Sequence, residues 1–305
     1  ELPDVLGTAE PKTNNLDMTT KGWDLQISWR DVVNDFNYGV SLVLSDSKTI
    51  INKYPNPAKE LGKYYDGAVY GDIWGFETVG IASSQAELAA HLAKADQSYC
   101  GANWTAGDIM YADINGDRVV DEGEYTADNH GDLKIIGNST PRYNFGLNFD
   151  FAYKGFDLKL FFQGTLKRDY MAGSATFWGA TGTGKWQALG FTAHSDYWTP
   201  ENTDAYYPRP DWGGWRNTWT QTRYLQNAAY CRLKNVTLGY NLPSRLTQKI
   251  YVQNLRLFVS AENLLTITKF TDISDPELIG AGYGGNLGKT YPLSKTVSFG
   301  VSVTF

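Results

Sequence analysis

Residues 143–164 read YNFGLNFDFAYKGFDLKLFFQG, and this stretch decides the fold. Aromatic and aliphatic side chains alternate with small or polar ones on both sides of Lys154-Gly155, which is the pattern of strands with one apolar and one polar face. Each run has the length that a tilted strand needs to cross a bilayer, roughly nine to eleven residues, whereas soluble strands are usually shorter. The stretch therefore predicts two membrane-spanning strands joined by a tight turn.

The same alternation recurs along the chain. It covers residues 22–30, 36–45, 235–242, 255–263 and 297–305, which makes seven strands in total. The connections alternate between short (31–35, 154–155, 243–253) and long (47–142, 169–230, 267–295). This alternation is typical of an outer-membrane barrel with periplasmic turns and extracellular loops. Single-chain bacterial barrels have an even number of strands, so we expect an all-β, antiparallel segment of a larger barrel.

Composition agrees with a β protein and excludes one class of partner. The chain has 14% aromatic residues and 31 glycines, which favour strands over helix bundles. Its net charge of −6 argues against nucleic-acid binding, because phosphate contacts need a basic surface. The mean hydropathy of −0.38 does not exclude a membrane barrel, since lipid-facing and lumen-facing residues alternate. A soluble β-sandwich or sugar-binding β-domain remains the alternative from pattern alone.

Several further motifs occur in order along nearly the whole chain. They are LPDVLGTAEPKTNNLDMTTKGWDLQISWRD (2–31), YGDIWGFETVGI (70–81), GDIMYADINGDRVVDEGE (107–124), YCRLKNVTLGYNLPSRL (230–246) and LRLFVSAENLLTITKF (255–270). Together with 143–164, they resemble the C-terminal part of SusC-like TonB-dependent transporters. The resemblance implies that residues 1–305 are a fragment of a barrel of about 22 strands, without the plug domain and the N-terminal strands.

The resemblance also implies a location and partners. We expect an integral protein of the outer membrane of a Gram-negative, Bacteroidetes-like bacterium, in contact with lipid. It implies import driven by TonB, which contacts the missing part of the chain together with the plug, and a SusD-like surface lipoprotein as partner. An oligosaccharide is the expected substrate and a peptide is the alternative. A soluble extracellular carbohydrate-binding protein is the rival function.

An enzyme is not expected, because the sequence shows no catalytic constellation. The three histidines, His91, His130 and His194, have no carboxylate or cysteine partner at a recognisable spacing. A glycoside hydrolase stays a third alternative, since paired carboxylates cannot be recognised without geometry.

The stretch DINGDRVVDEGE, residues 113–124, resembles a calcium loop in its spacing of oxygen-bearing residues. Calcium loops place ligands at positions 1, 3, 5, 7, 9 and 12, which here are Asp113, Asn115, Asp117, Val119 (through its carbonyl), Asp121 and Glu124. The glycine usual at position 6 is replaced by Arg118. We expect a structural Ca²⁺ that braces the loop, and an acidic turn held by its own Asx hydrogen bonds is the alternative.

Two other features concern the long loops. Residues 177–219 are rich in aromatic side chains, which stack on sugar rings or dock a partner. The candidate ligand-binding residues are Trp178, Trp186, Trp198, Trp212, Trp215 and Trp219. Cys100 and Cys231 both fall on the expected outer side, where conditions are oxidising, so a disulfide between them is a hypothesis.

Overall fold

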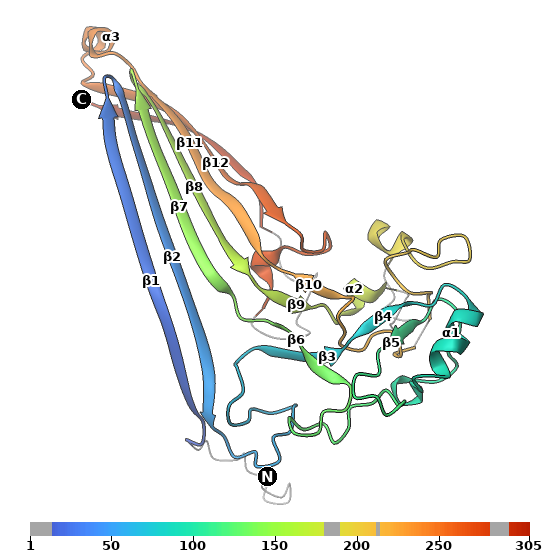
Figure 1. Ribbon diagram of the computed structural model, residues 1–305. Helices are drawn as coiled ribbons and strands as arrows, with labels where there is room; N and C mark the ends of the chain where they lie inside the picture. The colour runs from blue at the N-terminus through green and yellow to red at the C-terminus, as the bar shows by residue number, and fades with distance from the viewer. Residues whose placement is uncertain (1–13, 180–189, 212–213, 281–292) are drawn as a thin grey trace, which may run out of the picture.

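The computed structural model describes residues 14–179, 190–211, 214–280 and 293–305. Seven strands form one antiparallel sheet in the order β1-β2-β7-β8-β11-β12-β13. Their bounds are Asp17–Val33 (β1), Phe36–Lys53 (β2), Arg142–Tyr153 (β7), Phe156–Lys167 (β8), Tyr230–Asn241 (β11), Asn254–Thr268 (β12) and Thr296–Thr304 (β13). Figure 1 shows them side by side, with tight connections at one end and the long loops at the other. The predicted all-β fold is confirmed.

The strand register places most of the apolar strand residues on one face of the sheet. Leu42 in β2 pairs with Ile27 in β1 and with Leu147 in β7. Near the other edge of the sheet, Val259 in β12 pairs with Leu238 in β11 and with Phe299 in β13. Because side chains alternate between faces, this register continues across all seven strands as one apolar band of the kind that faces lipid.

The opposite face is polar and its side chains pair across strands. The hydroxyls of Ser28 and Ser41 lie 2.8 Å apart. The guanidinium of Arg256 in β12 donates from Nε to Oδ1 of Asp157 in β8 at 3.0 Å, which ties together two strands that flank β11. This face has the character expected of a barrel lumen.

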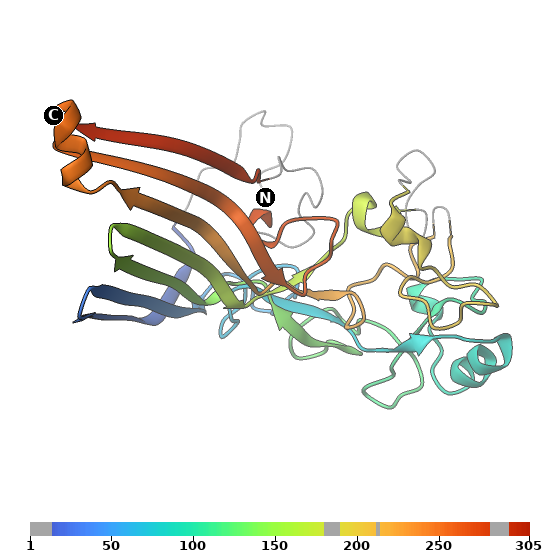
Figure 2. The ribbon, with the colours of Figure 1, turned by 90° about the horizontal axis from the view of Figure 1, so that it is seen from above.

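The tight connections lie at the end of the sheet where Phe305 also lies (Figure 1). Lys154 and Gly155 both have positive φ, 45° and 89°, as a two-residue type I′ turn requires. The third connection carries two short helices, α3 (Ser244–Thr247) and η5 (Gln248–Ile250). Figure 2 shows that the sheet is curved, as a segment of a barrel wall would be.

The first two strands are longer than the sequence predicts. The sequence predicts that the first long loop begins at residue 47, but β2 continues to Lys53. The apolar alternation ends before this extension, and the ladder to β1 continues through polar pairs such as Thr20 and Thr49, whose hydroxyls lie 2.8 Å apart. Backbone pairing rather than side-chain pattern therefore sets the end of β2.

The two longest connections contain secondary structure of their own. The first holds β3 (Asp72–Phe76), β4 (Thr78–Ile81), α1 (Gln85–Leu92), η2 (Ser98–Cys100), β5 (Ile109–Tyr111) and β6 (Leu133–Asn138). The second holds β9 (Asp169–Met171), α2 (Ala175–Trp178), η4 (Thr192–Ser195) and β10 (Leu225–Asn227), and η6 (Pro276–Leu278) lies in the third. Helix α1 begins directly after Ser84, whose hydroxyl caps it by accepting from the backbone N–H of Glu87.

The main hydrophobic core lies in these loops rather than in the sheet. We call the body that they form the head; it extends from one end of the sheet in Figures 1 and 2. Its buried cluster includes Phe76, Tyr111, Tyr170, Phe177 and Tyr224, which come from both long loops. Among the described residues, no helix has the length and apolar character needed to cross a membrane.

Candidate functional site

The two long loops are joined by backbone pairing. The N–H of Phe76 donates to the carbonyl of Thr220 at 2.8 Å, and the N–H of Thr222 donates to the carbonyl of Phe76 at 3.1 Å. Side chains extend this seam, since Nε1 of Trp219 donates to the carbonyl of Cys100 at 2.9 Å. Residues 217–222 of the second loop are thus held against the first loop.

A buried carboxylate fastens the same seam. Asp108 is fully buried and pairs with two arginines of the second loop, Arg209 (Nε–Oδ1 2.9 Å) and Arg216 (Nε–Oδ2 3.1 Å). The side-chain amide of Asn217 also donates to Oδ1 of Asp108 at 2.9 Å. A buried charge needs such partners, so the ion pairs couple the folding of one loop to that of the other.

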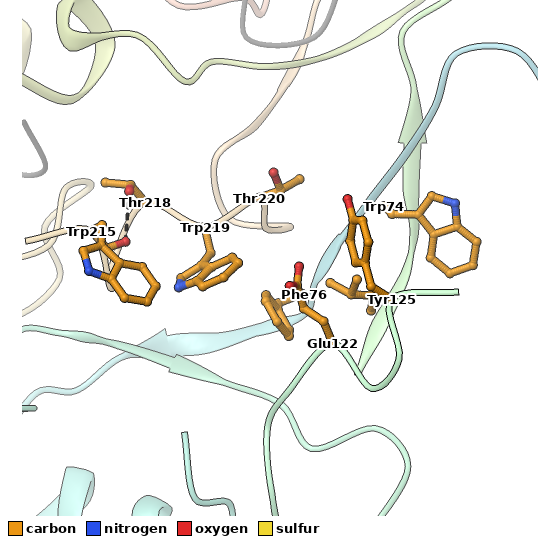
Figure 3. A pocket seen from close by; sticks show the side chains of 9 residues that line it. Trp74, Phe76, Glu122, Tyr125, Trp215, Thr218, Trp219 and Thr220 are labelled. Carbon is orange, nitrogen blue, oxygen red and sulfur yellow. Dashed lines mark hydrogen bonds between the residues drawn. The ribbon is translucent and has the colours of Figure 1, made fainter. Parts of the chain in front are cut away.

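A groove rich in aromatic side chains opens along the seam, with a volume of about 340 Å³. We call it the aromatic groove; it is lined by Trp74, Phe76, Glu122, Tyr125, Leu133, Trp215, Thr218, Trp219 and Thr220. Figure 3 shows the rings of Trp215, Trp219, Phe76, Tyr125 and Trp74 in a row, with Glu122 in the middle.

The indoles of Trp215 and Trp219 form one end of this row. Their ring centroids are 5.2 Å apart and their planes make an angle of 61°. The Trp219 ring also packs edge-on against Phe76 at 5.6 Å. Trp215 is 54% exposed, so one indole is anchored in the core and the other is open to a ligand.

The electrostatic character of the aromatic groove is negative. Among the described residues that line it, Glu122 is the charged one, and no lysine, arginine or histidine does so. The phenol of Tyr99 donates to Oε2 of Glu122 at 2.7 Å, and this hydrogen bond, with burial and the Glu122 charge, raises the pKa of Tyr99 to about 12. Burial also raises the pKa of the nearby Cys100 thiol, with a further contribution from the Glu122 carboxylate.

The predicted ligand-binding tryptophans have different fates. Trp215 and Trp219 line the aromatic groove. Trp178 is buried against Tyr224, with ring centroids 4.7 Å apart. Its side chain therefore belongs to the head core and, contrary to the prediction, is not exposed to a ligand. Trp198 packs on Gly107, where a Cβ would come within 2.4 Å of its ring. Trp186 and Trp212 lie outside the described residues.

Seven of the nine residues that line the groove were not predicted from the sequence, and Trp74, Tyr125 and Glu122 are the most informative of them. Trp74 and Tyr125 lie far from the tryptophan-rich segment in sequence, and Glu122 was passed over because it falls at a non-ligand position of the acidic loop. The one local signal was the YGDIWGF motif (70–76), which contains Trp74 and forms β3, the first strand of the head. The groove arises from the pairing of the two loops, which no local pattern reports.

In the acidic loop, the carboxylates accept hydrogen bonds from the backbone. Asp113 accepts from the N–H groups of Gly116 (2.7 Å) and Arg118 (2.9 Å), and Asp117 accepts from Val119 (2.8 Å). Arg118 has a φ of 72°, so a non-glycine residue makes the left-handed turn expected at that position. These contacts are those of the Asx alternative.

The loop is anchored by a residue outside the motif. Asp132 is fully buried and accepts from the N–H groups of Ile114 (2.6 Å) and Asp121 (3.0 Å), while burial raises its pKa. Within the described part of the chain, no three histidine, cysteine, aspartate or glutamate side chains converge as metal ligands do. The Ca²⁺ site stays a prediction.

The hypothesis of a disulfide is not supported by the structure. Cys100 and Cys231 are both free cysteines. Cys100 is buried in the head core, whereas Cys231 lies in β11 of the sheet, opposite Gly164 of β8. The two residues belong to different parts of the fold, which is the reason that they do not pair.

Comparison with known proteins identifies the relatives of this chain. It is 28% identical over its whole length to TonB-dependent receptor P3 of Formosa agariphila and 26% identical to TonB-dependent receptor P26 of the same organism. It spans 30% and 31% of the length of these two proteins. No family model matches the chain. The resemblance to TonB-dependent transporters and the outer-membrane location are confirmed by these relatives.

Solved structures support the same fold. A structure of the RagAB peptide transporter superimposes on the whole chain with a TM-score of 0.71, at 23% identity and over 31% of its own chain. A second one, the RagAB peptide importer in a closed-closed state, gives a TM-score of 0.70. The seven-stranded sheet and its head therefore share their fold with the part of the RagAB transporter on which they superimpose.

Proposed function

We propose that this chain forms part of the wall and the outer loops of a transporter that imports a nutrient across the outer membrane with energy from TonB. The expected substrate is an oligosaccharide, captured with a SusD-like surface lipoprotein. The observation that carries the proposal is the combination of a sheet with one continuous apolar face and a head in which two loops build an open aromatic groove.

The substrate class rests on the aromatic groove. Trp215 offers an exposed indole and Trp74 and Tyr125 continue the row of rings, which suits stacking on sugar faces. A groove of about 340 Å³ has the size of a site for a small ligand. Glu122 adds an acceptor for sugar hydroxyls.

Import of peptides is the second candidate. It is favoured by the fold, which is shared with transporters described as RagAB peptide importers. A soluble carbohydrate-binding protein is disfavoured, because the outward face of the sheet exposes large side chains such as Ile27 (55%) and Trp29 (61%) along a whole strand.

The test is purification of the transporter from outer membranes in a mild detergent, followed by intact mass and identification of co-purifying proteins and small molecules. We expect a larger chain that contains this sequence, a lipoprotein partner and a bound oligosaccharide. Recovery of a free 34.0 kDa protein from the soluble fraction alone would contradict the proposal. A bound peptide in place of a sugar would select the second candidate.

A further inference from the structure

We propose that the aromatic groove binds an ammonium group, so that the transported nutrient carries a primary amine. The inference rests on the proposed function for its context, but its grounds are the ring geometry, the single carboxylate and the charge of the surrounding head.

The rings supply faces that attract a cation. A cation within about 6 Å of the centroid of a tryptophan or tyrosine ring is attracted by the negative face, most strongly where water is partly excluded. Trp215 and Trp219 form two walls inclined at 61°, and Tyr125 and Trp74 continue the same groove. A groove lined with aromatic faces beside a carboxylate therefore suits an ammonium group.

Glu122 supplies the charge that distinguishes an ammonium group from a neutral sugar. Its Oε2 accepts the Tyr99 phenol, which fixes the carboxylate in the middle of the row of rings (Figure 3). Among the described residues, the structure gives Oε1 of Glu122 no hydrogen-bond partner and gives the carboxylate no ion pair. A hydrogen-bonded ammonium would complete the coordination of this carboxylate.

The surrounding loop strengthens the preference for a cation. Residues 54–141 contain fourteen aspartate and glutamate residues against five lysine and arginine residues, whereas the whole chain has 33 against 27. A cleft of one sign concentrates ligands of the opposite sign. The acidic loop 113–124 therefore provides the negative field of the groove and opposes binding of acidic ligands.

Two kinds of nutrient carry this group, namely oligosaccharides with free amino sugars and peptides with lysine or a free N-terminus. The ammonium group is common to both. The probes are a glucosamine tetrasaccharide and its N-acetylated form, and a lysine-containing tetrapeptide and its fully N-acetylated form. Each is titrated calorimetrically into the full transporter, purified with its partner in detergent.

We expect at least tenfold tighter binding of the amine form than of the acetylated form in one series, and that series identifies the source. The variant Glu122→Gln keeps a hydrogen-bond acceptor for Tyr99 and should lose the tenfold preference. Glu124→Gln is the matched control, because Glu124 is exposed in the same acidic loop and does not line the groove. Unchanged heat-modifiable gel mobility of both variants shows that the barrel is assembled.

Equal affinity for amine and acetylated forms in both series overturns the proposal, and so does a preference that survives in Glu122→Gln. Uptake by cells, measured with and without TonB, separates this result from the proposed function. Binding of the amine without TonB-dependent uptake would refute import but leave the ammonium site. Uptake of ligands without amine preference would refute the ammonium site but leave import.

Discussion

Arg118 occupies a backbone conformation that favours glycine. Its φ of 72° lies in the left-handed region, which costs a residue with a Cβ about 1–2 kcal/mol. Glycine avoids this cost but loses more entropy on folding, about 0.5–1 kcal/mol. We therefore predict that Arg118→Gly stabilises the acidic loop by roughly 0.5 kcal/mol. The measurement is slower amide hydrogen exchange at residues 113–121.

Gly116 provides the matched comparison. It has a φ of 82° in the same loop, and a Cβ placed there would meet no atom within 4 Å. Gly116→Ala should therefore destabilise the acidic loop by about 1 kcal/mol through backbone strain alone. Amide hydrogen exchange in residues 113–121 should become faster as a result. Equal exchange in both variants would show that φ at these positions does not control the stability of the loop.

Tyr99 should report the state of the aromatic groove by its titration. Its hydrogen bond to Glu122 and the charge of that carboxylate hold its pKa at about 12 in the folded protein, above the ordinary value of 10.0. Between these two values the unfolded chain releases the proton and the folded chain keeps it, so this contribution to stability is lost as pH rises from 10 to 12. Ultraviolet absorbance, compared with Tyr99→Phe, isolates the transition. Glu122→Gln should move it towards 10, and an unmoved transition would contradict the assigned cause.

At the scale of the element, Asp108 determines whether the second loop stays on the first. Asp108→Asn removes a fully buried charge from between Arg209 and Arg216, and a buried pair that loses one partner costs about 3–5 kcal/mol. We predict that residues 205–222 become accessible to proteases in this variant. Asp128→Asn is the control, since Asp128 is 72% exposed and pairs only at the surface with Lys59. Equal cleavage of the two variants would mean that the ion pairs of Asp108 do not hold the second loop against the first.

The sheet depends on close approach of backbones at Gly164 in β8. A Cβ at this position would lie 2.0 Å from the carbonyl oxygen of Tyr230 in β11, so Gly164→Ala should force the two strands apart and cost about 1–3 kcal/mol. Gly146→Ala in β7 is the control, because its Cβ would meet Phe161 at an ordinary 3.5 Å. The readout is the temperature at which folded mobility is lost on gels. The same temperature for both would contradict the role of Gly164.

The elements that sequence predicted well are those whose signal is local. The period-two pattern of residues 143–164 reports the faces of β7 and β8 because each side chain's direction follows from its neighbours. The aromatic groove was predicted only in part, since Trp219 and Phe76 come together through pairing of segments more than a hundred residues apart. Trp178 was predicted to bind a ligand, but it lies in the head core. Composition alone does not distinguish a buried aromatic side chain from an exposed one.

At the scale of the whole molecule, the two faces of the sheet should differ in their tolerance of charge. Leu42 lies between Ile27 and Leu147 on the apolar face, and Ser41 lies next to it on the polar face, where its hydroxyl contacts that of Ser28. An arginine on the lipid face near the middle of a bilayer costs about 2–4 kcal/mol, whereas lumen positions accept charge. Leu42→Arg should therefore reduce the fraction of full-length transporter that assembles in the outer membrane, and Ser41→Arg should leave it near the wild-type level. Heat-modifiable gel mobility of membrane fractions measures that fraction. If both variants assembled equally well, the apolar face could not be in contact with lipid, and the sheet would have to be covered by protein instead.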